Sequence, residues 1–568
     1  MIEKIKQEIK NEIEKSILMK YESSAPVIVE EPKKASQGDI SVPVFTIVKA
    51  LGKPMPEIVS FVKNVIEESP WATYLEEITP MGGFINLLLK KSSVGKRIVE
   101  DFFSEEHFGS SEIGKGKTVC IDYSSPNIAK SFSIGHLRST IIGHSIGNIL
   151  EKCGYKIVRI NHLGDFGTQF GKIIYAYLNF GDKEAVKQNP VEELAKLYVE
   201  FHELAKEQPE LEDKAREIFK ELEQNNPEYV ALWAWFREES LKDYMKVYNL
   251  LKVSFDSYHG EAFYNDKMAA VIDELKQKNL LKKDQGAMIV DLGEAYPPAL
   301  IQKSDGSTLY ITRDLSALFY RKNTYHFDKV LYVVGNEQKL HFDQIKKVVD
   351  LMGYDFSDQI VHVNFGLVLQ DGKKMSTRKG KTVKLEDVLQ EAINLSLTYI
   401  EEKNPDLENK ELTAEKIGVS AVVFNDLKNY RSGDFEFNLT DMVNFSGQTG
   451  PYLQYTSVRI TSILESVDYH ELTAFNPVFF EYDPAFEMLK QISIYKDIIE
   501  KSAEEYAPSI LAKYLLNMAS LFNTYYAKEK INVEDELERN TKCRLIYMVR
   551  NVLNDGMRLL GMQPIEKM

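Results

Sequence analysis

The chain has 568 residues, of which 44% are hydrophobic and 27% are charged. This length provides for about three or four domains, and the composition is typical of a globular protein with a large core. No apolar run approaches the roughly 20 residues that a bilayer-spanning helix needs. The first residues also lack the apolar core and cleavage site of a signal peptide. We therefore expect no membrane insertion and no cleaved leader.

The net charge is −15, from 70 Lys and Arg against 85 Asp and Glu. This balance argues against a protein that coats nucleic acid through bulk electrostatics, although a local basic groove can still bind one RNA. The three cysteines, Cys120, Cys153 and Cys543, show neither pairing nor metal-ligand spacing. The sequence therefore predicts no disulfide framework, no structural zinc and no other protein-bound metal, and a reducing cytoplasm fits best.

Residues 1–112 are predicted to form a first domain of the α+β class. Isoleucines recur at helical spacing from Ile2 to Ile17, which indicates an amphipathic helix. An apolar strand signal follows over residues 84–89, directly after two glycines. The residues of this domain indicate no chemistry by themselves.

Residues 119–150 pass from an apolar run through Pro, Ser and Gly into a helical pattern. A second strand signal over residues 156–160 completes the spacing of a β–α–β unit. In a doubly wound domain the turn then lies at the carboxyl end of a parallel strand, where backbone N–H groups bind anions. An ordinary capped turn is the plainer alternative for these residues alone.

The remaining signals complete a catalytic α/β domain over residues 113–440. Residues 183–251 are helical and strongly acidic, which favours a solvated insertion over a separate binding module. Strand signals return at residues 287–292, 307–310, 329–335 and 360–369, and we assign them to the second half of the same parallel sheet. Residues 441–568 carry long amphipathic patterns without strand signals and indicate an all-α bundle.

Two short segments resemble the signatures of class I aminoacyl-tRNA synthetases. Ser133 to His136, SIGH, resembles HIGH with Ser133 in place of the first histidine, and Lys374 to Arg378, KMSTR, resembles KMSKS. Two such elements in this order are more specific than either alone. The segments SSPNIAK, NHLGDFGTQFG, YITRD and SGQTGPYLQYTSVR resemble the arginyl-tRNA synthetase family, so the resemblance covers essentially the whole chain.

This resemblance implies a Rossmann-type core with helical insertions, an N-terminal domain that contacts tRNA and a C-terminal anticodon-binding domain. It implies that ATP activates L-arginine to arginyl-adenylate, which is then transferred to the 3′ end of tRNA-Arg. Mg²⁺ would accompany ATP as substrate, and activation itself would need the cognate tRNA. The implied partners are tRNA-Arg, L-arginine and ATP, and we expect a monomer.

The two signatures predict where the phosphates of ATP bind. The predicted catalytic residues are His136, Lys130, Lys374, Arg378 and Lys379. The predicted ATP-binding set adds Ser133, Gly135, Phe365, Gly366, Met375 and Ser376. Because a serine cannot carry positive charge, we expect Lys130 to compensate for Ser133. A solvated basic turn for KMSTR, and a simple strand end for Phe365-Gly366, are the plainer alternatives.

An arginine substrate presents a planar guanidinium with five donors, which calls for a carboxylate of matching geometry. By resemblance, the arginine-binding residues are Asp122, Ser125, Asn127, Tyr310, Asp314 and Gln338. We expect Asp122 and Asp314 at the ends of two strands of one sheet. The family usually carries glutamate in place of Asp122, so which carboxylate pairs with the guanidinium stays open.

Four residues of the C-terminal region are predicted to bind tRNA: Tyr452, Gln454, Tyr455 and Arg459. They combine aromatic faces with polar reach, as surfaces that stack splayed bases do, although the spacing of Tyr452 and Tyr455 fits a helix core equally well. One alternative function is a synthetase-like tRNA-binding protein that has lost activation, which Ser133 would explain. Another is a nucleotidyl-transfer ligase that acts on a small amine without RNA and would survive deletion of residues 442–568.

Overall fold

The computed structural model describes residues 1–303, 310–375, 377–378, 381–471 and 473–568. These residues divide into two compact units, each built from three separate stretches of chain. The first unit comprises Met1–Ser110, Tyr455–Ile499 and Tyr514–Gly556. The second comprises Ser111–Gln454, Glu500–Lys513 and Met557–Met568. Within the described ranges, no helix is long and apolar enough to cross a membrane.

The N-terminal part of the first unit is α+β, as predicted. Its elements are α1 (Ile2–Tyr21), η1 (Ala35–Gln37), β1 (Ile40–Pro43), α2 (Phe45–Leu51), α3 (Met55–Glu68), η2 (Pro70–Tyr74), β2 (Leu75–Met81), β3 (Phe84–Leu89) and α4 (Lys91–Ser104). The strands form an antiparallel sheet in the order β1-β3-β2. The isoleucine stripe of α1 is buried from Ile2 to Ile17, because residues three and four apart share one helix face.

The C-terminal region is helical, as the amphipathic patterns predicted. It contains α16 (Leu439–Met442), α17 (Gly450–Ser466), η7 (Pro477–Glu481), α18 (Asp483–Ser493), α19 (Tyr495–Glu504), α20 (Pro508–Lys528) and α21 (Glu536–Leu559). Leu515, Phe522 and Leu553 are fully buried within the first unit, so apolar stripes of α20 and α21 form its core. Residues 441–471 and 473–568 contain no strand.

The second unit is organised around a parallel sheet. Its strands are β4 (Thr118–Asp122), β5 (Lys156–Ile160), β9 (Lys329–Gly335) and β10 (Ile360–Phe365), in the order β10-β9-β4-β5. Cys120 lies opposite Val158 on one side and Val330 on the other. From β4 the chain continues to one neighbour and from β9 to the other, so the order switches between these two strands. Ligands of open α/β sheets bind at that position, outside the carboxyl ends of the strands.

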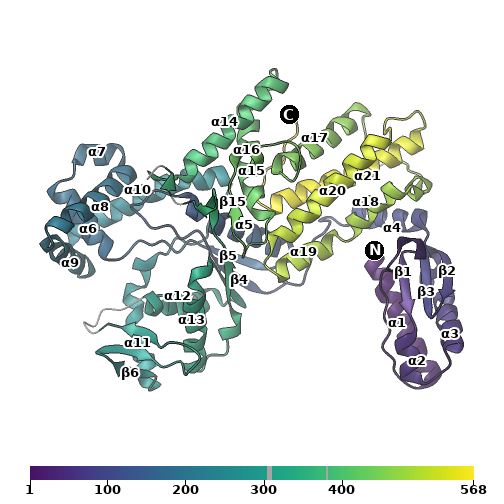
Figure 1. The fold of residues 1–568 in the computed structure, drawn as a ribbon, viewed down its shortest axis with the longest axis horizontal. Coiled ribbons are helices and arrows are strands. Elements are labelled where there is room, and N and C mark those ends of the chain that lie inside the picture. Colours follow the sequence, from purple (N-terminus) through teal and green to yellow (C-terminus); the bar gives the residue numbers. More distant parts are fainter. Residues whose placement is uncertain (304–309, 376, 379–380, 472) are drawn as a thin grey trace. The chain divides into compact units, whose positions relative to one another are not determined.

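Helices cover both faces of the parallel sheet. Figure 1 shows the strands between α5 (Leu137–Lys152) and the pair α12 (Tyr310–Tyr325) and α13 (Lys339–Leu351). On the side of α12 and α13, Cys120, Val330 and Ile360 belong to one buried cluster, which also includes residues of α11 (Met268–Gln277). Every second residue of a strand faces the same side, so the strands contribute to a core on each face.

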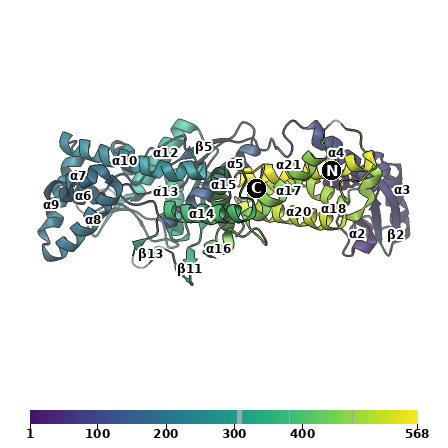
Figure 2. The same cartoon turned by 90° about the horizontal axis from the view of Figure 1, so that it is seen from above.

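The acidic region 183–251 consists of helices, as predicted. It contains α7 (Lys183–Gln188), α8 (Pro190–Glu207), α9 (Glu210–Glu223) and α10 (Pro227–Leu251). Helix α6 (Thr168–Asn179), just before this region, packs against α8 and α9. Figures 1 and 2 both show α6 to α9 grouped together, with α10 between this group and the parallel sheet.

The assignment of residues 287–292 to the parallel sheet was wrong. Strands β6 (Leu281–Asp284), β7 (Ala287–Val290) and β8 (Ala299–Gln302) form a separate antiparallel sheet. Gln285 and Gly286 both have positive φ, 45° and 87°, which closes a two-residue hairpin and forces antiparallel pairing. Of the strand expected at 307–310, residues 307–309 lie outside the described residues, and Tyr310 begins helix α12.

The strand expected over residues 360–369 is also interrupted, because β10 ends at Phe365 and β11 (Val368–Gln370) belongs to another sheet. That sheet has the order β12-β11-β15, with β12 (Lys373–Lys374) and β15 (Phe435–Glu436). The remaining elements are β13 (Thr377–Arg378), β14 (Lys381–Thr382), α14 (Leu385–Lys403), α15 (Lys410–Leu427), η3 (Ile134–His136), η4 (Glu261–Lys267), η5 (Asn336–Gln338) and η6 (Ser357–Gln359).

Candidate active site

The turn after β4 lies at the carboxyl edge of the sheet, where the sequence placed it. Ser124, Ser125 and Ala129 all have positive φ, between 47° and 73°, a conformation that residues with a Cβ adopt rarely. The hydroxyl of Ser125 donates to Asp122 Oδ1 over 3.0 Å. Beyond it, Asn127 is exposed and bridges to the loop after β5. The turn therefore presents Ser125 and Asn127 beside the end of β4.

Asp122 is paired with a guanidinium of the chain itself. Arg321 Nη2 lies 2.8 Å from Asp122 Oδ2, and the side chains of both residues are less than a tenth exposed. Burial alone would lower the pKa of Arg321, but the nearby Asp122 carboxylate raises it well above its ordinary value. Arg321 stands on α12 and was not predicted to take part in the site. Both oxygens of Asp122 therefore already have partners.

The second carboxylate, Asp314, lies in the first turns of α12 and not at a strand end as expected. Its Oδ2 is 2.6 Å from His341 Nε2 on α13. Although burial favours the protonated acid, this hydrogen bond lowers the pKa of Asp314. Burial lowers the pKa of His162, because it disfavours the charged imidazolium. The Asp122 and Asp314 carboxylates raise the same pKa. Arg321 Nη2 also lies 3.3 Å from His162 Nδ1, so His162 and Asp122 both contact the same guanidinium.

Tyr310 and Gln338 lie at the exposed side of the carboxyl edge of the parallel sheet. Tyr310 is the first residue of α12 and is 69% exposed. It stands four residues before Asp314, which places both on one helix face. Gln338 is exposed in η5, the turn that follows the carboxyl end of β9.

The SIGH segment forms a short helical turn in front of α5. The Ser133 backbone N–H donates to His136 Nδ1 over 3.2 Å, and the Ser133 hydroxyl lies 3.2 Å from the same nitrogen. Because Nδ1 accepts, Nε2 carries the imidazole proton and can donate to an anion. Burial lowers the pKa of His136 to about 4, so the ring is neutral at pH 7. Gly135 beside it is exposed.

The segment that follows KMSTR is hydrogen-bonded to the SIGH segment. Ile134 N–H donates to the Val383 carbonyl over 3.0 Å, and Leu385 N–H donates to the Phe132 carbonyl over 2.9 Å. Ser133 and Lys384 complete this antiparallel bridge. The end of the basic segment that contains the second signature therefore lies beside the first signature.

Lys374, Thr377 and Arg378 of the KMSTR segment lie on short strands. Lys374 is exposed on β12, and Met375 is buried with its N–H donating to the Val368 carbonyl over 2.8 Å. Arg378 belongs to β13. Ser376 and Lys379 lie outside the described residues. Lys130, from the turn after β4, has its Nζ 5.4 Å from the ring centroid of Tyr198 on α8.

Gly366 is required where β10 ends. A Cβ there would come within 2.5 Å of the Gly433 carbonyl oxygen and of Asp434 Oδ1. The Gly366 N–H donates to the Arg431 carbonyl over 3.0 Å, while Phe365 is partly buried. The predicted adenine-facing pair thus lies against the loop before β15.

A family model described as "tRNA synthetases class I (R), catalytic domain" matches residues 99–439, more than half of the chain. The chain belongs to the class I arginyl-tRNA synthetase family. Two further models match this arginyl-tRNA synthetase: "Arginyl tRNA synthetase N terminal domain" over residues 3–89 and "DALR anticodon binding domain" over residues 453–568.

Relatives of this synthetase match it over nearly its whole length. Arginine–tRNA ligase of Enterococcus faecalis is 48% identical over 95% of each chain, and that of Streptococcus uberis is 47% identical over 99% of each. The crystal structure of arginyl-tRNA synthetase from Plasmodium falciparum is 27% identical, with a TM-score of 0.75 over 99% of each chain. The Thermus thermophilus arginyl-tRNA synthetase has the same fold, with a TM-score of 0.77 at 21% identity over 99% of this chain.

The four residues predicted to meet tRNA in this synthetase differ in exposure. Tyr455 is 39% exposed, and Arg459 stacks on its ring with Cζ 4.7 Å from the centroid. Tyr452 is partly buried. Gln454 is fully buried, and its amide donates to the Gln563 carbonyl over 2.6 Å. A side chain so buried presents no atom to an RNA, so the prediction for Gln454 does not fit this structure.

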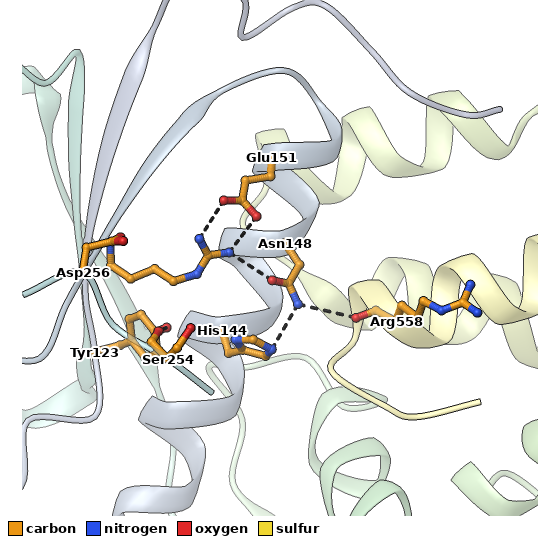
Figure 3. Close-up of polar contacts among 8 residues, drawn as sticks. Tyr123, His144, Asn148, Glu151, Ser254, Asp256 and Arg558 are labelled. Carbon is orange, nitrogen blue, oxygen red and sulfur yellow. Dashed lines mark hydrogen bonds and ion pairs between the residues drawn. The ribbon is translucent and has the colours of Figure 1, made fainter. Parts of the chain in front are cut away.

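Some residues that support the synthetase site are far from it in the sequence, and the sequence did not predict them. Helix α5, which follows SIGH, is tied at its far end to β5 and to the C-terminal segment (Figure 3). Arg159 of β5 makes a bidentate pair with Glu151 at 2.7 and 2.8 Å. The Ser145 hydroxyl donates to the Leu559 carbonyl over 3.0 Å. Of the missed residues, only Arg321 had a usable signal, since it lies two helical turns after Asp314 on one face.

Proposed function

We propose that the protein ligates L-arginine to the 3′ end of tRNA-Arg at the carboxyl edge of the parallel sheet. In the first step an arginine carboxylate oxygen attacks the α-phosphorus of ATP, and pyrophosphate leaves. In the second step the terminal 2′-hydroxyl attacks the carbonyl carbon, and AMP leaves. The observation that carries the proposal is the hydrogen-bonded pairing of the SIGH segment with residues 383–385, in the same compact unit as Asp122 and Asp314. Relatives named arginine–tRNA ligase support it.

The phosphates of ATP are assigned to the two signatures. A neutral His136 donates from Nε2 to a phosphate oxygen, and the exposed backbone at Gly135 allows close approach. The positive charge that Ser133 lacks comes from four residues: Lys130, Lys374, Arg378 and Lys379. Met375 and Ser376, from the second signature, also bind ATP. Phe365 and Gly366 face adenine. Mg²⁺ enters bound to the triphosphate; among the described residues, no cluster of three His, Cys, Asp or Glu could hold a metal ion.

The arginine pocket is assigned to Asp122, Ser125, Asn127, Tyr310, Asp314 and Gln338. Asp314 pairs with the substrate guanidinium, because its partner is a histidine that is charged only when protonated. Asp122 instead faces the permanently charged Arg321, so it contributes less negative charge to a ligand. Asp122 then orders Ser125 at the pocket wall.

The remaining parts are assigned to tRNA. Residues 1–112 contact tRNA, residues 113–440 catalyse and residues 441–568 bind the anticodon, with Tyr452, Tyr455 and Arg459 on the contacting surface. Exposed Tyr455 and its stacked Arg459 form the type of platform on which bases stack. The protein acts as a monomer in the cytoplasm.

Arginine-dependent exchange of pyrophosphate into ATP, with and without tRNA-Arg, tests the function. We expect exchange with arginine and tRNA-Arg together and none with lysine. A protein that binds tRNA-Arg but exchanges no pyrophosphate in either condition would be the synthetase-like binding protein, and the proposal would be wrong.

Single substitutions test the assigned roles. We expect Asp314→Asn to raise the KM for arginine at least tenfold, Asp122→Asn to raise it less, and neither to change the KM for ATP. Arg378→Ala should mainly lower kcat. Asp291→Asn is the matched control, since Asp291 pairs with Lys282 on the surface at 2.9 Å. Equal KM values for arginine in the control and in Asp314→Asn would refute the assignment.

A further inference from the structure

The turn between Asp122 and Lys130 adopts a backbone that it would not keep by itself. Ser124, Ser125 and Ala129 have φ of 73°, 47° and 57°, and a Cβ disfavours the left-handed region. Strain of this kind persists only where the surroundings impose it. The contacts that impose it therefore determine where the turn presents its side chains.

Those contacts come from one face of α10, the last helix of the insertion. The Tyr244 hydroxyl donates to the carbonyls of Asn127 and Lys130 over 2.6 and 2.8 Å. Four residues earlier, the Ser240 hydroxyl accepts the Ala129 N–H over 2.9 Å. Residues spaced by four lie on one helix face, so α10 holds the second half of the turn at several backbone groups.

The next residue on this face, Tyr248, holds the first half of the turn. Its hydroxyl lies 2.7 Å from the Ser124 hydroxyl and accepts the Asn161 amide over 2.9 Å. Asn161 in turn accepts the Ser125 N–H over 3.2 Å. Tyr248 thus reaches Ser125, the residue that hydrogen-bonds Asp122.

The same two rings support the SIGH segment. Phe132 lies 5.3 Å from Tyr244 and 5.4 Å from Tyr248 between ring centroids. On its other side Phe132 stacks on His136 at 5.0 Å and 10°. Both tyrosines are fully buried, and burial raises the pKa of each hydroxyl, so both stay protonated donors at neutral pH.

We propose that α10 is a positioning element of the active site, in which Tyr244 and Tyr248 hold the strained turn and Phe132. The insertion is then part of the catalytic apparatus and not only a solvated addition. This inference rests on the proposed function, because the turn presents Asn127 to arginine and Lys130 to ATP. The Tyr244 hydroxyl positions residues for both substrates, because it bonds Asn127 and Lys130. The Tyr248 hydroxyl positions the arginine side alone, because it reaches Ser124 and Asn161.

Removing single hydroxyls tests the proposal with the ring packing intact. We expect Tyr248→Phe to raise the KM for arginine about tenfold, equivalent to ~1.4 kcal/mol, with the KM for ATP unchanged. Tyr244→Phe should raise the KM for both substrates. The matched control is Tyr514→Phe, because Tyr514 is a buried tyrosine of the first unit that donates to the Gln491 carbonyl over 2.8 Å. The control should keep both KM values.

Hydrogen exchange measured by mass spectrometry gives a readout that does not depend on activity. The peptide over residues 122–131 should exchange faster in Tyr244→Phe and Tyr248→Phe, while the peptide over residues 137–150 stays protected. Wild-type KM values together with wild-type exchange in both variants would overturn the proposal. Absence of pyrophosphate exchange in the unmodified protein would instead refute the proposed function, and faster hydrogen exchange at the turn would still support the positioning role.

Discussion

At the scale of single residues, the buried pair of Asp122 and Arg321 links the stability of the protein to the proposed arginine pocket. Both charges are buried away from water, so each depends on the other to offset the loss of its hydration. Removing one partner of such a pair costs about 3–5 kcal/mol, whereas replacing both by apolar groups can be nearly neutral. A change at Asp122 therefore alters stability together with arginine binding, and the melting temperature must be measured beside its KM.

Glu261 is predicted to make stability depend on pH near neutrality. Burial raises the pKa of Glu261 to about 7, against the effect of Arg313 at 3.4 Å. Asp314 and Asp165 raise it further. The folded-state pKa of Glu261 exceeds the unfolded value of 4.5. Its ionisation therefore leaves the free energy of unfolding unchanged below about pH 4.5 and lowers it progressively as pH rises to about 7.

Glu261→Gln removes this titration. The melting temperature of the variant relative to the unmodified protein should therefore increase between pH 5 and pH 8. The shift corresponds to at most about 3 kcal/mol at 1.36 kcal/mol per pKa unit, and a constant offset from the lost ion pair is expected in addition. A difference that does not change over this pH range would contradict the raised pKa.

Single-sequence reasoning located one side of the pocket and not its supports. The strand, turn and helix that follow one another locally are visible in the residue pattern, and they predicted an anion-binding turn near His136. Asp122 and Ser125 were assigned to the arginine pocket only by the family resemblance. Arg321 and His341 were not assigned as partners, because a sequence does not show which charges of separate elements meet in the fold, although its spacing places Arg321 on the same face of α12 as Asp314. Tyr244 and Tyr248 lie in a region that the sequence predicted only as a solvated helical insertion, and their contacts with the turn were not predicted for the same reason.

At the scale of elements, the contact between α14 and α15 depends on a glycine. A Cβ at Gly418 would come within 2.6 Å of the Ile393 backbone nitrogen and 2.7 Å of the Ala392 carbonyl carbon. Backbone atoms cannot move aside as the end of a flexible side chain can, so the helices would have to separate. The closeness of these two helices thus follows from one missing methyl group.

We predict that Gly418→Ala lowers the free energy of unfolding by about 2 kcal/mol through overpacking. The matched variant is Gly147→Ala on α5, where the three atoms nearest to the new methyl all belong to the guanidinium of Arg159, the nearest at 3.3 Å. There the gain in helix propensity of up to about 1 kcal/mol should leave stability unchanged or improved. Urea denaturation measures both, and equal effects at the two sites would contradict the packing argument.

The errors made at the level of strands have a common cause. Periodicity predicts that residues 287–292 and 360–369 are extended, but it does not say which strand each one pairs with. A hairpin at Gln285 and Gly286 diverted the first into an antiparallel sheet, and the close approach of Gly433 to Gly366 ends β10 in the second. Element type was therefore predictable over most of the chain, while sheet membership depended on contacts distant in sequence.

At the scale of the whole molecule, the compact units do not follow the order of the chain. Residues 557–568 belong to the same unit as the parallel sheet, although the sequence groups them with the anticodon-binding helices. The Gln563 N–H donates to Ser420 over 3.1 Å, and Leu560 and Met562 are buried. Deletion of residues 442–568 would thus remove part of the catalytic unit and cannot by itself test for an activity without RNA.

The final residues of the chain should accordingly stabilise the catalytic unit. Met562→Ala removes a side chain that is 2% exposed and should cost about 2–5 kcal/mol. Removal of residues 566–568 takes away two exposed side chains and one partly buried one, so it should cost less than about 1 kcal/mol. The melting temperature and hydrogen exchange of residues 137–150 should both change in the first variant, because the Ser145 hydroxyl of α5 bonds the carbonyl of Leu559. Equal melting temperatures for the two variants would show that the C-terminal segment does not support α5.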